Sequence, residues 1–281
     1  MSSSQQNFSF SCEFFPPKTD KGRENIETTI VELKQLNPDY ISCTYGAGGT
    51  TQDGTFDTVQ NIMQHGISAA PHITCIGSTK EKISRLLQQY KDAGVSRIVA
   101  LRGDLPEGMD DPGEFQFANE LVEYIRCETG DHFTIEVAAY PETHPQSKNM
   151  HDELIQFAKK AQAGADAAIT QYFYNADAWV RFVEDCQRLD ISIPIVPGIY
   201  PITNYKQLAR FSASCGAEIP RWITTRLESY GDDLDSIRAF GFDVTLQLCE
   251  QLIDAGAPGL HFYSMNRAEP TARLWHELNL G

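Results

Sequence analysis

The feature that most constrains the fold of this chain is a repeated alternation of two hydrophobic patterns. Short apolar runs rich in β-branched and aromatic residues alternate with segments whose apolar residues recur at the spacing of a helical turn. Eight apolar runs are visible, at residues 8–15, 39–45, 69–75, 97–101, 133–140, 167–174, 193–198 and 259–264. Amphipathic segments between them include residues 25–36, 80–94, 113–126 and 152–164. The runs indicate β-strands, and the segments indicate α-helices with one polar face.

Strands that are apolar along most of their length and alternate with helices favour a parallel sheet covered by helices. Eight such units close into a barrel. Between the seventh and eighth strands, residues 221–256 indicate an extra short helix followed by a long one. No linker or low-complexity stretch divides the chain. We therefore predict an α/β fold, a single (β/α)8 TIM barrel over residues 1–281 with an extra helix between strands 7 and 8.

Composition excludes several classes of protein. Hydrophobic residues make up 41% and charged residues 22% of the 281 residues, as in a folded globular protein and unlike a disordered chain. The 38 Asp and Glu residues outnumber the 23 Lys and Arg residues, and the net charge is -15. Because nucleic-acid binding needs a basic surface, this charge argues against a nucleic-acid partner.

Cysteines and the first residues of the chain bear on where the protein works. The chain has 7 cysteines, an odd number, with no CxxC pair and no metal-type Cys/His spacing, so buried reduced thiols are favoured and no metal site is expected. The opening residues MSSSQQNFSF lack the basic and apolar regions of a signal peptide. No apolar run approaches the roughly 18 residues that span a bilayer. We expect a cytoplasmic protein with no membrane partner.

Polar residues at the carboxyl ends of the predicted strands are the candidates for function, because barrel active sites form at that end. Along the chain they are Glu13, Thr44, Tyr45, His72, Arg102, Asp104, Tyr140, Gln171, Pro197, Gly198 and Tyr263. Glu13 lies within an apolar strand, where burial would raise its pKa toward a value useful to a general acid. A carboxylate paired with a barrel cation is an equally good interpretation.

Several of these residues have alternative structural interpretations. Arg102 and Asp104 could form an ion pair within a tight turn, and Lys159 and Lys160 are typical of a solvated helix face. His72 and His144 could be histidines that serve only as hydrogen-bonding residues, and the aromatics Tyr205 and Phe211 could be core. The small-residue turn 46–49 could let a ligand approach the backbone. No GxGxxG, P-loop or HExxH motif is present, so spacing alone leaves a barrel enzyme of open chemistry.

At these strand ends the sequence closely resembles the methylenetetrahydrofolate reductase family. The resemblance runs in order through EFFPPK (13–18), TYGAGG (44–49), APHITCIG (70–77), VALRGDLP (99–106), AAYPETHP (138–145), AGADAAITQYF (163–173), PGIYPITNYKQ (197–207) and HFYSMNRAE (261–269). It covers essentially the whole chain. The family fold is a (β/α)8 barrel, which agrees with the strand count.

The resemblance implies a chemistry and roles for single residues. Enzymes of this family use noncovalent FAD to pass a hydride from NADH or NADPH to 5,10-methylenetetrahydrofolate, which becomes 5-methyltetrahydrofolate for methionine synthesis and one-carbon metabolism. Glu13 resembles the general acid that protonates the folate toward N10 so that its five-membered ring opens to an iminium cation. Asp104 resembles the catalytic carboxylate beside flavin and pterin. Further substrate-binding positions are implied at Gln171, Gln207, Phe211 and Arg267.

The resemblance also implies a flavin site. Its residues are Thr44, Tyr45, Ala47, His72, Leu101, Arg102, Gly103, Asp104, Phe117, Ala118, Tyr140, His144, Glu153, Gln156, Lys159 and Lys160. Two positions depart from the family pattern. Phe117 stands where relatives have Tyr, and the family's aspartate on the fifth helix is matched by Asp152 or Glu153. Because every ligand is anionic and the chain is acidic, we expect a few local cations to bind them, with Arg102, Lys159, Lys160, Arg267, His72 and His144 as candidates.

Two rival functions remain. A flavin-free lyase or aldolase would use Glu13 as base and Lys160 as Schiff-base lysine, but Lys160 lies on a predicted helix and not at a strand end. A folate- or flavin-storage protein would not need the proton donor that Glu13 provides. The sequence does not distinguish NADH from NADPH. A homo-oligomer without an appended regulatory domain is expected by resemblance.

Overall fold

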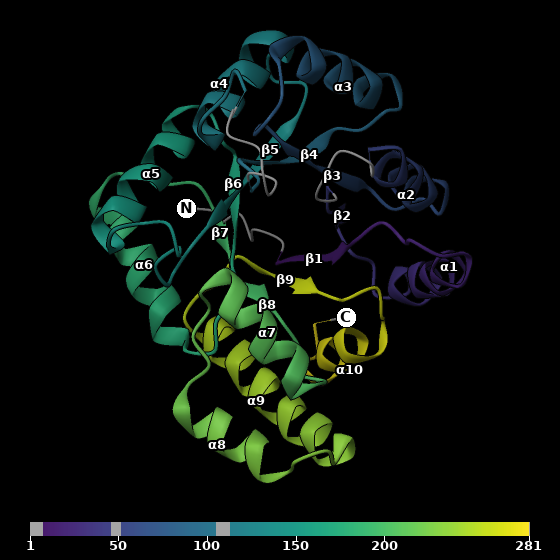
Figure 1. Ribbon diagram of the computed structural model, residues 1–281, viewed down its shortest axis with the longest axis vertical. Coiled ribbons are helices and arrows are strands. Elements are labelled where there is room, and N and C mark those ends of the chain that lie inside the picture. Colours follow the sequence, from purple (N-terminus) through teal and green to yellow (C-terminus); the bar gives the residue numbers. More distant parts are fainter. Residues whose placement is uncertain (1–7, 46–51, 105–112, 281) are drawn as a thin grey trace, which may run out of the picture.

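The computed structural model describes residues 8–45, 52–104 and 113–280. Its parallel strands are β1 (Ser9–Phe14), β2 (Tyr40–Cys43), β3 (Ala69–Thr74), β4 (Arg97–Leu101), β5 (Thr134–Ala139), β6 (Ala167–Thr170), β7 (Ile195–Val196), β8 (Gly198–Ile199) and β9 (Gly259–Tyr263). In these residues they form a nine-stranded sheet in the order β7-β6-β5-β4-β3-β2-β1-β9-β8. The sheet curls into a nearly closed barrel surrounded by helices, which confirms the predicted fold class (Figure 1).

The helices follow the strands in alternation. They are α1 (Asp20–Lys34), α2 (Gln52–Gln64), α3 (Lys80–Asp92), α4 (Ala118–Thr129), α5 (Met150–Gln162), α6 (Ala176–Arg188), α7 (Tyr205–Cys215), α8 (Arg221–Ser229), α9 (Leu234–Asp254) and α10 (Glu269–Glu277). Several begin at a residue whose side chain accepts a backbone N–H, such as Thr19 for α1 and Asn149 for α5. Such caps satisfy donors that the first helical turn leaves unpaired. None of the described helices is long and apolar enough to cross a membrane.

The predicted seventh strand is divided into β7 and β8. Pro197 lies between them and has no N–H to give to a strand ladder, although its carbonyl accepts from His261 N at 3.0 Å. β7 pairs with β6, whereas β8 pairs with β9. This short divided segment therefore joins the two edges of the sheet and brings β6 and β9 to the same part of the barrel.

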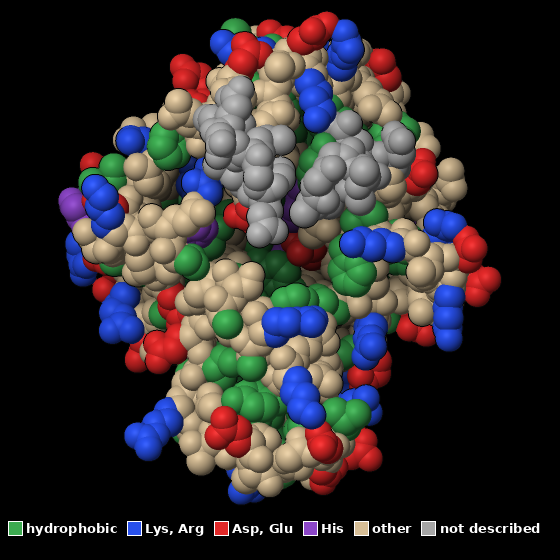
Figure 2. All heavy atoms as spheres, in the orientation of Figure 1, with side chains coloured by type: hydrophobic (Ala, Val, Ile, Leu, Met, Phe, Trp, Pro, Cys, Tyr) green, Lys and Arg blue, Asp and Glu red, His purple; other side chains and the backbone are tan. Residues whose placement is uncertain are grey.

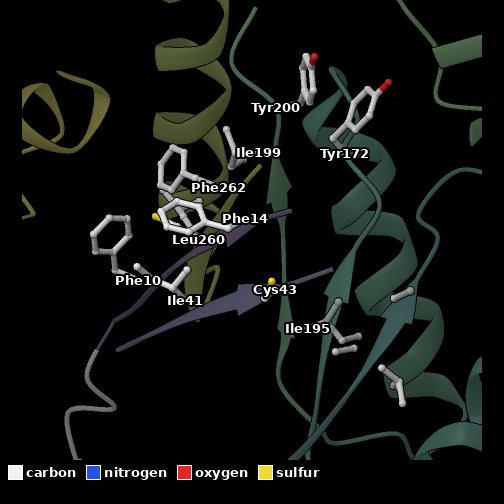
Figure 3. Close-up of a cluster of buried hydrophobic side chains, with 14 of the residues drawn as sticks. Phe10, Phe14, Ile41, Cys43, Tyr172, Ile195, Ile199, Tyr200, Leu260 and Phe262 are labelled. Atoms are coloured by element: carbon white, nitrogen blue, oxygen red, sulfur yellow. The ribbon is translucent and has the colours of Figure 1, made fainter. Parts of the chain in front are cut away.

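Side chains alternate between two cores along each strand. Phe10, Phe14 and Phe262 point outward into the apolar layer beneath the helices, and Figure 3 shows them clustered there. The inward-facing positions carry a smaller apolar cluster of Tyr40, Ala70, Val99 and Ile169. Polar residues fill much of the remaining barrel interior, including fully buried Ser11 and His261.

Gly198 permits the close approach at the divided strand. A Cβ atom on Gly198 would lie 2.2 Å from the Thr170 carbonyl oxygen and 2.6 Å from the Tyr263 ring. Gly198→Ala should therefore lower the free energy of unfolding by about 2 kcal/mol, the usual cost of overpacking. Urea unfolding measures this loss. Gly54→Ala is the control, because a Cβ at that helical position meets nothing closer than 3.4 Å; an equally stable Gly198→Ala protein would contradict the close packing.

Candidate active site

Glu13 lies near the end of β1 between two histidines, one on the adjacent strand β9 and one on β3, which is separated from β1 by β2. Its Oε2 is 3.3 Å from His72 Nε2 on β3 and 3.8 Å from His261 Nε2 on β9. The side chain of Glu13 keeps 18% of its surface exposed, while those of His72 and His261 keep 8% and 0%. The carboxylate is therefore open to a ligand on one side and enclosed by imidazoles on the other.

The expected raised pKa of Glu13 is wrong for this geometry. Burial raises the pKa of Glu13, but the charge and hydrogen bonding of His72 and His261 outweigh it and bring the pKa down to about 2. The sequence indicated that Glu13 is buried, but it did not indicate that His72 and His261 lie beside it. Without a ligand, the carboxyl group of Glu13 is therefore ionised at neutral pH.

A cavity of about 510 Å³ opens at the ends of β4 and β5 and the start of α4 and α5. It is lined by Leu101, Arg102, Gly103, Asp104, Phe117, Ala118, Tyr140, His144, Glu153, Gln156 and Lys160, all of them candidate flavin residues. Glu13 lies near the carboxyl end of β1 and the cavity lies at the carboxyl ends of β4 and β5, so both open at the same end of the barrel. Figure 2 shows acidic and histidine side chains around the hollow at the centre of this face.

The turn after β4 separates Arg102 from Asp104. Gly103 has a φ of +82°, and a Cβ there would lie 3.0 Å from Thr74, so the turn requires glycine. The Arg102 guanidinium donates to Gln146 Oε1 and to the Gly103 carbonyl. Among the described residues it forms no ion pair with Asp104, whose side chain is exposed at the cavity edge. An exposed carboxylate at the edge of the cavity can be reached by a ligand.

The two lysines of α5 have different surroundings. Lys159 is exposed and lies outside the cavity lining, as the solvated-face interpretation expected. Lys160 is buried, so that interpretation is wrong for it; its Nζ donates to the Ala138 carbonyl at 2.6 Å. Burial lowers the pKa of Lys160 to about 8, although the nearby Glu153 acts to raise it. Glu153 itself accepts from Ser147 Oγ at 2.5 Å.

His144 and Tyr140 form the far wall of the cavity. Their rings meet edge to face, 4.6 Å between centroids. Burial lowers the pKa of His144, and its Nδ1 accepts from the Gln146 backbone N–H. Because this shift favours neutral His144, the positive charges in the cavity lining are those of Arg102, Lys148 and Lys160.

The other candidate flavin residues lie elsewhere. His72 faces Glu13, and Thr44 follows β2, where its N–H donates to Phe14 O at 2.9 Å. Neither these two nor Tyr45 lines the cavity. Ala47 and the glycines of its turn lie outside the described residues.

The candidate substrate residues come from the segments that follow β6 and β9 and from α7. Gln171 follows β6, and its Oε1 accepts from the Tyr172 N–H. Gln207 and Phe211 are one helical turn apart on α7, and Phe211 packs edge to face on Tyr200 with centroids 6.0 Å apart. Arg267 is exposed in the segment before α10 and lines a separate cleft of about 470 Å³. These residues flank the barrel mouth and do not line the cavity described above.

Sequence reasoning missed His261 and the residues Gln146, Ser147 and Lys148 of the cavity wall. His261 could have been found by alternation, because it precedes Tyr263 by two positions on β9 and faces the same side. The wall residues belong to an irregular turn after β5, for which no periodic signal exists. No group of three metal-binding side chains occurs among the residues that the structure describes.

Comparison with known proteins identifies related chains. The family model described as methylenetetrahydrofolate reductase matches residues 1–279. The 5,10-methylenetetrahydrofolate reductase of Pectobacterium carotovorum subsp. carotovorum is 37% identical over 277 residues, 98% of this chain and 92% of that protein. The enzyme of that name from Escherichia coli (strain K12) is 35% identical with the same coverage.

Two further relatives add detail. Methylenetetrahydrofolate reductase (NADH) 1 of Arabidopsis thaliana is 37% identical over 93% of this chain and 47% of its own length. A solved Clostridium thermocellum protein, described as binding two copies of 5-methyl-5,6,7,8-tetrahydrofolic acid, has a TM-score of 0.70 at 19% identity, covering 97% of this chain and 95% of its own. At that identity the likeness concerns the fold.

Proposed function

Because the chain belongs to the methylenetetrahydrofolate reductase family, we propose that it is an FAD-dependent enzyme that uses NADH or NADPH to reduce 5,10-methylenetetrahydrofolate to 5-methyltetrahydrofolate. The observation that carries the proposal is the occurrence, at the same end of the barrel, of a partly exposed carboxyl, Glu13, and a cavity lined by cations and aromatic rings. The product would serve methionine synthesis. The plant relative named for NADH favours a nicotinamide reductant without deciding which one this chain prefers.

The residues of the cavity fit FAD. Arg102 and Lys160 are cations of the kind that bind a diphosphate, and Tyr140 and Phe117 supply aromatic surface. Bound FAD would supply the hydride transfer that no side chain can perform. The Lys160 ammonium, held at the Ala138 carbonyl, would meet phosphate charge inside an otherwise acidic protein. Asp104, exposed at the cavity edge, would face the pterin.

Glu13 would deliver the proton that opens the folate ring. A substrate lying over the barrel mouth would cover the 18% of Glu13 that is exposed, and further burial favours the neutral carboxylic acid. The neutral Glu13 would then give its proton to the folate nitrogen and become a carboxylate. Gln171 and Phe211 would hold the pterin and a flat ring of the substrate from the other side.

The test is anaerobic absorbance. The purified protein should be yellow, and its flavin absorbance should bleach when NADH or NADPH is added under nitrogen, because the nicotinamide passes a hydride to the flavin. Bleaching by one nucleotide alone would assign the reductant. A colourless protein that binds no added FAD would contradict the flavin part of the proposal.

The rival functions are less well supported. A Schiff-base role for Lys160 finds some support in its lowered pKa, but its Nζ is hydrogen-bonded to Ala138 O. Borohydride trapping with a carbonyl substrate would detect such a lysine. A storage protein would not need Glu13, whose replacement would then leave the protein's properties unchanged. We also propose that the enzyme is a cytoplasmic homo-oligomer, which light scattering and cell fractionation would test.

A further inference from the structure

The strand that carries Glu13 stops pairing with its neighbour β9 at Glu13 itself. Among the described residues, the ladder between β1 and β9 ends where Glu13 meets Tyr263, and the two strands lie side by side in Figure 1. Beyond Phe15 come Pro16 and Pro17, which have no N–H to give to a strand ladder. On the side of β9, the residues that follow Glu13 must therefore be held by something other than a regular ladder.

The side chain of Asn266 takes the place of the ladder. Its Oδ1 accepts from the Phe15 N–H at 2.9 Å, and its Nδ2 donates to the Phe15 carbonyl at 2.8 Å. An asparagine amide has the donor and the acceptor of a peptide group, so it can pair with Phe15 as a neighbouring strand would. Ser264 Oγ also donates to the Glu13 carbonyl at 2.7 Å. The backbone from Glu13 to Phe15 is thereby tied to the β9 turn, residues 264–267.

The β9 turn has an uncommon backbone and is anchored independently of β1. Met265 and Asn266 both have positive φ, 54° and 56°. Such values are rare for residues other than glycine, and surrounding contacts must hold them in place. The Arg267 N–H donates to the Ser264 carbonyl across the turn at 3.0 Å. The Asn266 carbonyl accepts from Thr29 Oγ1 on α1 at 3.2 Å.

We propose that Asn266 is a positioning residue that holds Glu13 at a fixed place relative to Arg267. The inference rests on the proposed function, in which Glu13 gives the proton and Arg267 is a substrate cation. Strained backbone conformations cluster at functional sites, which agrees with the φ values of the β9 turn. Without the Asn266 amide, the turn would keep Arg267 in place through its own hydrogen bonds, whereas the end of β1 would be free to move.

Asn266→Gly removes the amide and leaves the shape of the turn. Glycine adopts positive φ without strain, so only the two bonds to Phe15 are lost. Hydrogen–deuterium exchange at the Phe15 amide, followed by NMR, should become about tenfold faster than in the wild-type protein. This measurement needs no substrate. Exchange at the wild-type rate would show that Asn266 does not hold β1, whatever reaction the protein catalyses.

The kinetic consequence of Asn266→Gly should fall on one half-reaction. Misplacement by about 1 Å can lower a rate about a hundredfold, so kcat for folate reduction should fall about tenfold to a hundredfold. KM for the folate should stay within about twofold of the wild-type value, because Arg267 keeps its place. Flavin reduction by NADH or NADPH should keep its rate. An equal fall in both half-reactions, or an unchanged folate rate beside faster Phe15 exchange, would overturn the proposal.

Ser264→Ala tests the same tie from its other end and serves if Asn266→Gly does not fold. Loss of the hydroxyl releases the Glu13 carbonyl, and kcat for folate reduction should fall while KM and flavin reduction stay unchanged. A Ser264→Ala protein in which KM rises and kcat is kept would contradict the placement of Glu13 by this turn.

Asn279→Gly is the matched control. Asn279 also has positive φ, 53°, and its side-chain amide donates to the Glu277 carbonyl at 3.3 Å, but it lies beyond the end of α10. Phe15 exchange and both half-reactions should be unchanged in it. Absence of folate reduction in the wild-type protein would count against the proposed function alone, and Phe15 exchange would still decide whether Asn266 holds β1.

Discussion

Glu13→Gln should abolish folate reduction and leave flavin reduction by NADH or NADPH close to the wild-type rate. The amide has the size of the carboxyl but cannot give up a proton to the folate, and general acids contribute about a hundredfold to ten-thousandfold. The nicotinamide step needs no proton from Glu13. Stopped-flow absorbance separates the two half-reactions, with the flavin colour lost in the first and regained in the second.

Glu27→Gln is the matched control for this variant. Glu27 also pairs with a histidine, His65, at 2.7 Å, but it lies on α1 and is half exposed. Both half-reactions should be unchanged in it. Folate turnover at the wild-type rate in Glu13→Gln would show that the proton comes from another group.

Lys160→Met should weaken FAD binding by about tenfold to a hundredfold, the usual value of a hydrogen bond to a charged group. Lys160 is buried in the cavity wall, and its Nζ donates to Ala138 O on β5 at 2.6 Å. Lys159→Met provides the comparison, because the structure leaves that neighbour exposed and outside the cavity. Fluorescence titration with FAD measures both, and equal losses would contradict the separate surroundings of the two lysines.

The lowered pKa of Lys160 adds a pH dependence with a definite sign. Because the folded-state pKa is about 8, below the ordinary 10.5, the unfolded chain binds more protons between these values and the free energy of unfolding rises with pH there. FAD binding should go the opposite way and weaken as the pH rises above about 8, where the ammonium loses its charge. Lys160→Met should lose both dependences.

The fold could be predicted from the sequence because its strands have the strongest pattern. β4 was located at its observed bounds, Arg97–Leu101, and β3 and β9 within one residue at each end. The prediction of the seventh strand was less accurate. Pro197 interrupts the strand, and the two-residue strands on either side of it pair with different neighbours, β7 with β6 and β8 with β9. Periodicity carries no information about such a break, whereas proline chemistry does.

The site was harder to predict than the fold. The strand-end rule gave Glu13, Arg102, Asp104 and Tyr140, because each directly follows or ends an apolar run. The rule could not give the pKa of Glu13, because that pKa depends on His72 and His261. Both histidines are far from Glu13 in the sequence and come close to it only in the folded barrel. The rule also could not tell that Lys159 is exposed and Lys160 is buried. Consecutive residues of a helix point in different directions, so one can face solvent while the next faces the core.

The most direct test of the account is a single turnover under nitrogen. The protein is bleached with one equivalent of NADH or NADPH and then mixed with 5,10-methylenetetrahydrofolate, and the folate products are separated. The account predicts that the flavin colour returns and that about one 5-methyltetrahydrofolate forms per flavin. A bleached flavin that stays reduced in the presence of the folate, with no 5-methyltetrahydrofolate formed, would contradict it.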